Sequence, residues 1–435
     1  MTVAGSPVSE GGVGEPQPPR MDILIIADDL SGAADCAIPF VRAGQRTVVA
    51  LDPVGADVEV GSLTLAVDAD TRRLTGEEAA RRTRAIYMAH RRAGQRLYKK
   101  IDSTLRGNWA EEVAALRPVA GMAIVAPAYP ALGRTVRGGN VYVGGRTLAD
   151  TELWKLEHEH RPAAIDAQLR QAGLASDTLD ADASRNDPEA LAARIDAFAS
   201  RGLDALIVDA VSEQTMRTLA QATLVSQAPF FWVGSGGLAR EIAALQSSRP
   251  LPDEAGLPRS SGPTLVLVGS LSAVTDRQCA VLLESAAVRQ LVVPPSVLRR
   301  GAMHDDWPSL QASIGELLGF GTDLLLRIGR EQALDPSEGA LLATALAKLV
   351  GPHVSKAGAI IATGGETARA ILVEAGIDSL ELVAELQTGI AAGLPRGARA
   401  HRPLIVTKAG GFGSDQALHA AWSRLRSPGS RTPPA

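Results

Sequence analysis

The chain has 435 residues, 46% of them hydrophobic, which is enough for two or three domains that each bury a core. Its 44 basic and 48 acidic side chains give a net charge of −4, which provides no attractive field for nucleic acid. No apolar run approaches the roughly 18–20 residues of a membrane helix, and residues 1–20 carry no signal-peptide core. Two distant cysteines, Cys36 and Cys279, fit a reducing compartment, so we predict a cytoplasmic protein.

Short β-branched segments alternate with Ala-rich helical stretches along the first half of the chain. The predicted strands cover residues 22–27, 47–51, 63–67, 97–101, 122–126, 205–208 and 230–233. Residues 31–41 and 109–116 are predicted helices that follow two of these strands. The alternation predicts a first α/β domain over residues 21–246, a mostly parallel sheet flanked by helices.

A second alternating series follows a Pro-rich segment, 247–263, which has no apolar period and is predicted to be a linker. Strands are expected at 264–268, 291–293, 324–328, 359–362, 380–383 and 404–407. They predict a second α/β domain over residues 264–426. The ends of the chain, 1–20 and 427–435, are rich in Gly, Pro and Ser and are expected to be a disordered extension and tail.

Two acidic residues follow the first predicted strand. In open parallel sheets, ligands bind beyond the carboxyl ends of the strands, where loops lead into helices. Asp28 and Asp29 occupy such a position. Adjacent carboxylates there can hold a metal, accept hydrogen bonds from sugar hydroxyls or act as a base, whereas Asp29 alone would also suit a helix N-cap.

A second polar loop, DSTLRGN at 102–108, follows the strand at 97–101. Lys100 and Asp102 are two residues apart and are expected to share a side of the strand, with Ser103 and Arg106 just beyond. Cations suit a carboxylate and Asp suits hydroxyls, so the loop predicts a site for a small anionic polyol. Arg72, which follows the strand at 63–67, could add another contact to the carboxylate.

Glycine-rich loops follow three predicted strands of the second half. They are VGSLS at 268–272, ATGGET at 362–367 and TKAGGFG at 407–413. Glycines let backbone amides approach phosphate oxygens, and helix N-termini add a favourable dipole. Three such loops in one domain favour a nucleotide, although the sequence has neither a Walker A motif nor the protein-kinase motifs.

Two other functions stay open at this point. GSGGLA at 234–239 fits the dinucleotide fingerprint and would suit an NAD-dependent dehydrogenase. The acidic residue expected about 20 positions later is absent from a strand end, because Asp253 and Glu254 fall in the Pro-rich segment. The other alternative is a non-catalytic protein that binds a sugar acid.

The sequence resembles the four-carbon acid sugar kinases, a family that includes D-threonate, D-erythronate and 3-oxo-tetronate kinases. The resemblance extends from residue 21 to about residue 425. It rests on IADDLSGA at 26–33, KKIDSTLRGN at 99–108, GRT at 133–135, GS at 269–270, GGET at 364–367 and KAGGFG at 408–413. Ser31 stands where we expect Thr, and residues 154–162 depart from the family pattern; these two departures bear on the substrate and not on the use of ATP.

The resemblance implies an ATP-dependent kinase that phosphorylates the terminal hydroxyl of a four-carbon acid sugar, with D-threonate first and D-erythronate or 3-oxo-tetronate next. The implied sugar site in the first domain comprises Asp28, Asp29, Arg72, Lys100, Asp102, Ser103 and Arg106. The implied nucleotide site in the second domain comprises Ser270, Gly364, Gly365, Glu366, Thr367, Gly410 and Gly411.

Phosphoryl transfer depends mainly on positioning and charge neutralisation, which Gly loops, Mg²⁺ and cationic side chains supply. We predict Asp102 as the catalytic base, with Asp29 as the second candidate. ATP and Mg²⁺ are the expected cofactors, although the sequence does not identify the Mg²⁺ ligands. The expected partners are the acid sugar and ATP, without nucleic acid or membrane, and the oligomeric state is left open.

Overall fold

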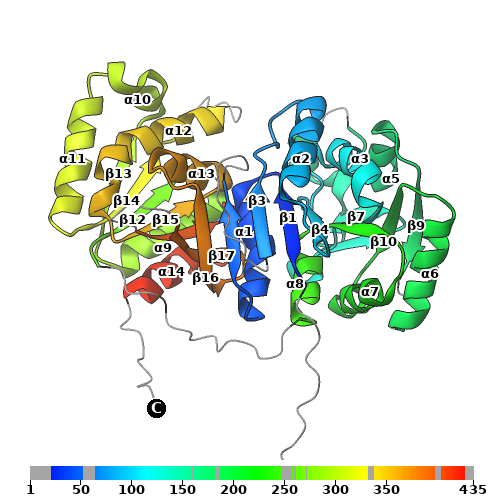
Figure 1. Cartoon of the computed structure of the whole chain (residues 1–435). Helices are drawn as coiled ribbons and strands as arrows, with labels where there is room; N and C mark the ends of the chain where they lie inside the picture. The colour runs from blue at the N-terminus through cyan, green and yellow to red at the C-terminus, as the bar shows by residue number, and fades with distance from the viewer. Residues whose placement is uncertain are drawn as a thin grey trace, which may run out of the picture.

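The computed structural model describes residues 21–51, 64–157, 161–181, 187–246, 257, 261–270, 272–331, 338–396 and 403–426. In these residues two α/β domains lie side by side, and one sheet of 15 strands runs through both (Figure 1). This confirms the predicted two-domain α/β fold. The predicted extension, the predicted tail and most of the predicted linker lie outside the described residues.

The first domain is built on eight parallel strands in the order β2-β3-β1-β4-β11-β5-β10-β9. The third strand in this order, β1, has the sequence ILIIA and is buried along its whole length because helices cover both faces of the sheet. The strands are β1 (Ile23–Ala27), β2 (Thr47–Ala50), β3 (Thr64–Asp68), β4 (Arg96–Lys100), β5 (Met122–Ala126), β9 (Ser176–Asp180), β10 (Ala205–Asp209) and β11 (Phe230–Gly234).

Helices connect these strands, and several begin at the capping residues that the sequence provides. Thr75 and Glu78 form a capping box, and Asp187 caps a helix that has proline in its first turn. The helices are α1 (Leu30–Arg42), α2 (Gly76–His90), α3 (Trp109–Ala120), α4 (Glu152–Glu157), α5 (Ile165–Gln171), α6 (Pro188–Ser200), α7 (Glu213–Val225) and α8 (Gly236–Ala244). A separate small antiparallel sheet, unexpected from the sequence, contains β6 (Arg134–Arg137), β7 (Asn140–Val143) and β8 (Arg146–Thr147).

The second domain has a parallel core in the order β13-β14-β12-β15-β18, extended by an antiparallel hairpin of β17 and β16. The strands are β12 (Thr264–Val268), β13 (Val288–Val293), β14 (Asp323–Ile328), β15 (Ala359–Thr363), β16 (Ser379–Gln387), β17 (Ile390–Pro395) and β18 (Leu404–Lys408). The helices are α9 (Ala273–Ser285), α10 (Pro295–Arg300), α11 (Trp307–Gly319), α12 (Gly339–Val350), α13 (Gly365–Glu374) and α14 (Ala417–Arg426). None of the helices in the described ranges is long and apolar enough to cross a membrane.

The hairpin joins the two domains. β16 pairs antiparallel with β2 through Ser379–Ala50 and its neighbours, and β16 lies beside α1 in the middle of Figure 1. Arg42 and Arg240 of the first domain both bind Glu385, whose side chain is only 4% exposed. A mostly parallel sheet was expected, but the antiparallel strand that carries residues 380–383 was predicted only as one more member of the alternating series.

Candidate active site

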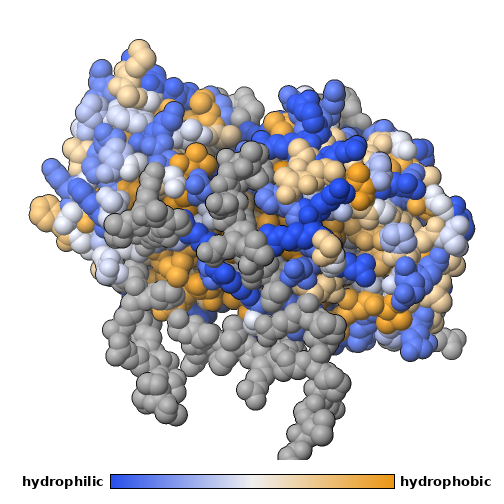
Figure 2. Space-filling model, in the orientation of Figure 1, coloured by the Kyte–Doolittle hydropathy of each residue, from blue (hydrophilic) through white to orange (hydrophobic). Residues whose placement is uncertain are grey.

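The carboxyl ends of β3, β1 and β4 meet at one edge of the sheet. Ala27 at the end of β1 is in register with Asp68 on one side and Lys100 on the other. The loops that follow these strands carry the residues predicted for the sugar site, so parallel pairing brings together segments far apart in sequence. On the face in Figure 2, hydrophilic residues gather near the middle, where the two domains meet.

Asp28 and Asp29 share one cation. Arg72 donates from Nε to Asp28 Oδ2 at 2.8 Å and from Nη1 to Asp29 Oδ2 at 2.9 Å. Burial would raise the pKa of Asp28, but the Arg72 guanidinium, together with the Lys99 and Lys100 ammonium groups, holds this pKa below its usual range. Asp29 is also the N-cap of α1, because its Oδ1 accepts from the backbone amide of Gly32 at 2.9 Å. Asp29 therefore has the predicted cap role and also lies in the polar cluster.

Lys99 and Lys100 serve different parts of the structure. The Lys99 ammonium lies 2.9 Å from Glu112 on α3, and both side chains are fully buried. Lys100 is only 6% exposed, and its Nζ lies 2.9 Å from the position that a Cβ on Gly32 would occupy. Lys100 therefore reaches the start of α1, where Gly32 leaves room for it.

The loop after β4 is held in a tight turn around Asp102. Arg106 donates from Nε to Asp102 Oδ2 at 2.6 Å, and the Thr104 hydroxyl donates to the same oxygen. Burial would raise the pKa of Asp102, but Arg106 more than compensates and holds this pKa well below its usual range. Leu105 adopts a left-handed φ of 59°, which is uncommon outside glycine and marks the turn as constrained.

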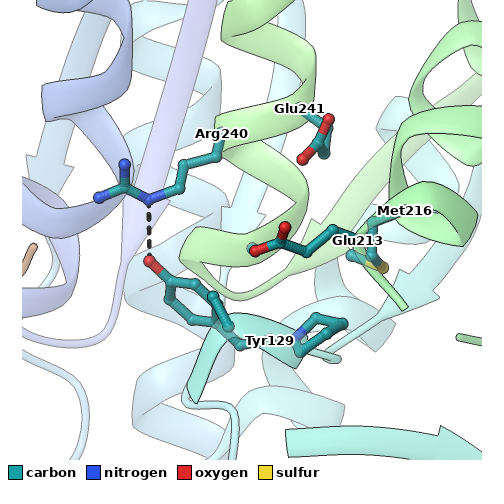
Figure 3. Close-up of a pocket in the computed structure, with 8 residues that line it drawn as sticks. Tyr129, Glu213, Met216, Arg240 and Glu241 are labelled. Atoms are coloured by element: carbon teal, nitrogen blue, oxygen red, sulfur yellow. Dashed lines mark hydrogen bonds between the residues drawn. The ribbon is translucent and has the colours of Figure 1, made fainter. Parts of the chain in front are cut away.

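Three further residues reach this cluster that the sequence reasoning did not single out. Arg134, at the start of β6, donates to the Ser103 hydroxyl and lies close enough to Asp102 for their charges to interact. Tyr129 accepts from Arg240 Nε at 2.9 Å, as the dashed line in Figure 3 shows. Arg134 lies in the GRT segment at 133–135, and this motif was the one sequence feature that could have pointed to it.

Asp35 is the third of these residues and lies on α1 beyond Ser31. Its Oδ1 is buried and has no hydrogen-bond partner among the described residues. Burial raises the pKa of Asp35, although Lys100 and Arg240 act in the opposite direction. Its other oxygen fills the space that a Cβ on Gly236 would need. A carboxyl inside an otherwise Ala-rich helical stretch was the sequence signal for it.

The three glycine-rich loops of the second domain converge. Gly364 donates its amide to Lys408 O at 2.8 Å, and the Thr275 hydroxyl donates to Gly410 O at 2.8 Å. A Cβ on Gly410 would lie 2.9 Å from the Ser270 hydroxyl. The structure thus brings Ser270, the 364–367 turn and Gly410 to one place at the carboxyl ends of β12, β15 and β18.

Lys408 holds one of these loops in shape. Its Nζ donates to Ala409 O and Gly410 O at 3.0 Å each, and its side chain is almost fully buried. Burial lowers the pKa of Lys408 to about 8. The sequence reasoning quoted Lys408 as part of the motif but did not place it in the site.

The two predicted sites face each other across the domain boundary. A Cβ on Gly365 would lie 3.0 Å from Asp29 Oδ2 and 3.2 Å from the Ser31 hydroxyl. The N-terminus of α13 therefore abuts the N-terminus of α1. Glu366, predicted for the nucleotide site, forms a half-exposed ion pair with Arg73 at 2.5 Å.

GSGGLA at 234–239 has the strand–turn–helix context of a dinucleotide site, but its glycines make room for protein atoms. In the fingerprint, the backbone approaches the pyrophosphate at the second glycine, which is Gly236 here. A Cβ on Gly236 would collide with Asp35 Oδ2 and would lie 3.1 Å from Tyr129 Cε1, so protein atoms occupy this space. The packing therefore argues against the dehydrogenase alternative.

Two further features bear on ligands. A small pocket beside α8 is lined by Tyr129, Glu213, Met216, Arg240 and Glu241 among others (Figure 3). Tyr129 and Arg240 also lie close enough to Asp35 for their charges to interact. Within the described ranges, no group of three or more His, Cys, Asp or Glu side chains could hold a metal ion alone.

Two family models match successive parts of the chain. Residues 23–242 match a family model described as a sugar-binding N-terminal domain, and residues 265–418 match one described as a nucleotide-binding C-terminal domain. A solved structure from Salmonella typhimurium has the same fold, with a TM-score of 0.76 at 22% identity over 92% of this chain and 98% of that one.

Curated relatives match over nearly their whole length. A D-threonate kinase of Cupriavidus necator is 47% identical over 95% of this chain and 100% of that protein. A D-threonate kinase of Bordetella bronchiseptica is 34% identical, covering 93% and 97%. A 3-oxo-tetronate kinase of Cupriavidus necator is 30% identical, covering 92% and 96%. The chain therefore belongs to the four-carbon acid sugar kinase family, with its sugar-binding and nucleotide-binding domains in that order.

Proposed function

We propose that D-threonate is the substrate of this kinase and that ATP donates its γ-phosphoryl group to the terminal hydroxyl. The observation that carries this proposal is the closeness of Gly365, in the predicted nucleotide loop, to Asp29, in the sugar cluster. A phosphoryl group can pass directly between two ligands only when their sites adjoin. The name of the 47%-identical relative favours D-threonate over other four-carbon acids.

Lys100, Arg106 and Arg134 supply positive charge for the substrate carboxylate. Arg106 is engaged by Asp102 at 2.6 Å, so the incoming carboxylate competes with Asp102 for the guanidinium. Arginine holds carboxylates in charge-assisted, often bidentate hydrogen bonds, which fix orientation as well as adding affinity. We propose that substrate binding draws Arg106 from Asp102 to the substrate carboxylate.

This exchange would also prepare Asp102 to act as the base. While Arg106 is bound, the low pKa of Asp102 makes it a weak proton acceptor. Loss of the guanidinium removes the main cause of the low pKa, and Asp102 then accepts the proton of the terminal hydroxyl as the oxygen attacks phosphorus. Asp29 remains the second candidate, but both of its oxygens already accept hydrogen bonds.

Asp35 would accept a hydrogen bond from a substrate hydroxyl. Its unpartnered Oδ1 is an acceptor. Lys100 and Tyr129 both lie close enough to the Asp35 carboxyl to interact with it electrostatically. A buried acceptor without a partner is costly, and a substrate hydroxyl would satisfy it. This arrangement supports binding of a polyhydroxy acid rather than a simple carboxylic acid.

Mg²⁺ would enter with ATP. Nucleotide-bound Mg²⁺ takes most of its ligands from phosphate and water and needs only one or two carboxylates. Asp29 lies beside the predicted nucleotide loop and would be the carboxylate that holds the ion. Bound there, Mg²⁺ would neutralise charge on the transferring phosphoryl group. The absence of nucleic acid as a partner and the cytoplasmic location stay predictions, and the oligomeric state stays open.

A substrate screen tests the proposal. ATP consumption would be followed with D- and L-threonate, D- and L-erythronate and 3-oxo-tetronate, in the presence and absence of MgCl₂. We expect the highest kcat/KM with D-threonate and a requirement for the metal. A higher kcat/KM with 3-oxo-tetronate or D-erythronate would overturn the choice of substrate while leaving the family assignment intact.

A further inference from the structure

One short loop of the sugar-binding domain is bound at two points by the first turns of α13. This loop, residues 69–73, follows β3 and is called here the β3 loop. Arg369 of α13 donates from Nη1 to Asp68 Oδ2 at 2.5 Å, and its Nε lies 3.0 Å from Asp70 Oδ2. One turn earlier in α13, Glu366 pairs with Arg73 at 2.5 Å. The β3 loop is therefore attached to the helix that begins at the nucleotide loop.

The contact of Arg369 with Asp68 is largely shielded from water. Asp68 is fully buried, the Arg369 side chain is 21% exposed, and Arg369 also donates to Leu51 O at 3.2 Å. Charge-assisted hydrogen bonds are stronger in such surroundings than at an open surface. Arg369 thus binds three acceptors of the sugar-binding domain, two of which belong to the β3 loop or to the strand end before it.

The same carboxylate fixes the shape of the loop. Asp68 Oδ1 accepts from the amide of Asp70 at 3.0 Å, and Asp70 has a left-handed φ of 49°. An Asp in this conformation is uncommon and needs local contacts to hold it. Arg369 binds both carboxylates at this turn, so it stabilises the conformation in which Asp70 is held.

The far end of the loop reaches the sugar cluster. Thr71 donates its amide to Asp28 O at 3.1 Å, and the next residue, Arg72, binds the carboxylates of Asp28 and Asp29. Only one residue, Thr71, separates Asp70 from Arg72. A change in the turn at Asp70 would therefore move the guanidinium that organises the two carboxylates.

We propose that Arg369 is a positioning residue that couples nucleotide binding to acid-sugar affinity through the β3 loop. The proposal rests on the proposed function, because it assumes that ADP or ATP occupies the 364–367 turn and that the acid sugar occupies the Asp28–Arg106 cluster. A nucleotide that fixes the start of α13 against the sugar-binding domain favours the state in which Arg369 holds Asp68 and Asp70. The sugar then binds a site that is already ordered.

Such coupling must be reciprocal. If ADP raises the affinity for D-threonate by some factor, D-threonate raises the affinity for ADP by the same factor. Coupling between two sites of one protein typically amounts to about 5- to 150-fold. A residue that only stabilised the fold would lower both affinities or the yield of folded protein without changing this ratio.

Isothermal titration calorimetry on the full chain measures the ratio. The Kd of D-threonate is determined with and without saturating ADP and MgCl₂, and the Kd of ADP with and without saturating D-threonate, at pH 8. We expect wild type to bind D-threonate at least about 5-fold more tightly with ADP present. Arg369→Ala should reduce this factor to below 2-fold and leave the Kd of ADP alone within about 2-fold of wild type.

Two variants guard against a general folding defect. Asp70→Asn removes the second charge partner of Arg369 at a side chain that is 54% exposed, and Asn tolerates left-handed φ, so it should also lose coupling while folding normally. Arg426→Ala is the matched control, because Arg426 also binds a buried carboxylate, Asp323, but at the amino end of β14. Its coupling factor should equal that of wild type.

The outcomes separate the two proposals. Coupling of wild-type size in both Arg369→Ala and Asp70→Asn would overturn the role of Arg369, and so would a wild type in which ADP leaves the Kd of D-threonate unchanged. If wild type binds ADP but no D-threonate under either condition, the proposed function fails and the coupling proposal fails with it.

Discussion

Lys99 Nζ lies 2.9 Å from Glu112 Oε2, and both side chains are completely buried between β4 and α3. Glu112 also accepts from the hydroxyls of Thr71 and Thr83 through its other oxygen. The pair therefore attaches α3 to β4 and at the same time to the β3 loop that carries Arg72. Lys100, next in sequence, reaches the start of α1. Of the two adjacent lysines, Lys99 therefore supports the fold and Lys100 lies in the candidate site.

Removing one member of this pair should destabilise the protein strongly. Glu112→Gln leaves the Lys99 charge buried without its counterion, which typically costs about 3–5 kcal/mol. We expect a loss of this size in urea unfolding followed by tryptophan fluorescence. Arg170→Ala removes an exposed ion pair with Asp166 and should cost less than about 1 kcal/mol. Equal losses in the two variants would show that burial of the pair is unimportant.

Arg106 should matter for the sugar and not for the nucleotide. Charge-assisted contacts to a carboxylate contribute about 1.5–3 kcal/mol, so Arg106→Ala should raise the KM or Kd for D-threonate by roughly tenfold or more. The Kd of ADP should stay the same, and Arg106→Lys should recover part of the loss. An unchanged KM for D-threonate in Arg106→Ala would remove Arg106 from the site.

Asp102 should control turnover rather than binding. Loss of a general base typically costs about 100- to 10,000-fold in rate, so Asp102→Asn should bind ATP and D-threonate yet turn over slowly. Because Arg106 and Thr104 bind Asp102, the thermal stability of the variant is measured alongside kcat. A folded variant that retains more than about a tenth of wild-type kcat would rule out Asp102 as the base on this scale and direct attention to Asp29 and Asp35.

Because the glycine-rich loops pack closely together, adding a single methyl group to one of them should weaken nucleotide binding. A Cβ on Gly269 would overlap the Thr367 hydroxyl, so Gly269→Ala should push the 364–367 turn out of place and weaken ADP binding by at least about tenfold. Gly319→Ala, at the end of α11, adds a methyl group whose nearest neighbour would be the Lys356 ammonium at 3.8 Å. Its Kd for ADP should match wild type, and similar affinities in both variants would contradict the predicted nucleotide site.

The stability contributed by Asp68 should decline as pH rises. Burial raises the pKa of Asp68 to about 7, against the lowering effect of Arg369, while Asp70 and Asp29 also raise it. An unfolded aspartate titrates near pH 3.9, so between about pH 4 and pH 7 the folded state holds a proton that the unfolded state releases. The contribution is complete below this window and is lost through it, at no more than about 1.4 kcal/mol per pH unit.

Asp68→Asn cannot titrate and isolates this contribution. The difference in unfolding free energy between wild type and Asp68→Asn, measured in urea at pH 5, 6, 7 and 8, should fall as pH increases. A difference that stays constant from pH 5 to pH 8 would show that Asp68 is ionised throughout this range in the folded protein.

The order of strands and polar loops was enough to predict most of the fold and to place much of the candidate site at strand ends. Strand 264–268 was predicted with the bounds that the structure shows, and Asp28, Lys100 and Asp102 lie at the strand ends where the pattern placed them. These features are local, because a buried strand followed by a polar loop is visible in a short stretch of sequence.

The remainder depends on which segments pair in three dimensions. The sequence of residues 380–383 does not indicate that their strand runs antiparallel or that it pairs with β2 of the other domain. Asp35 lies inside a helix, and its place in the candidate site is visible only in the fold, where Lys100, Gly236 and Arg240 lie around it. Arg369 likewise has no motif, because its three acceptors come from distant positions in the chain.

The account depends most directly on phosphoryl transfer from ATP to the terminal oxygen of D-threonate. Phosphorus NMR on wild type incubated with ATP, MgCl₂ and D-threonate identifies the product without a coupling enzyme. The account predicts a phosphomonoester signal coupled to the terminal methylene protons, formed in equal amount with ADP. ADP released with inorganic phosphate alone, or a phosphate ester at another carbon, would contradict it.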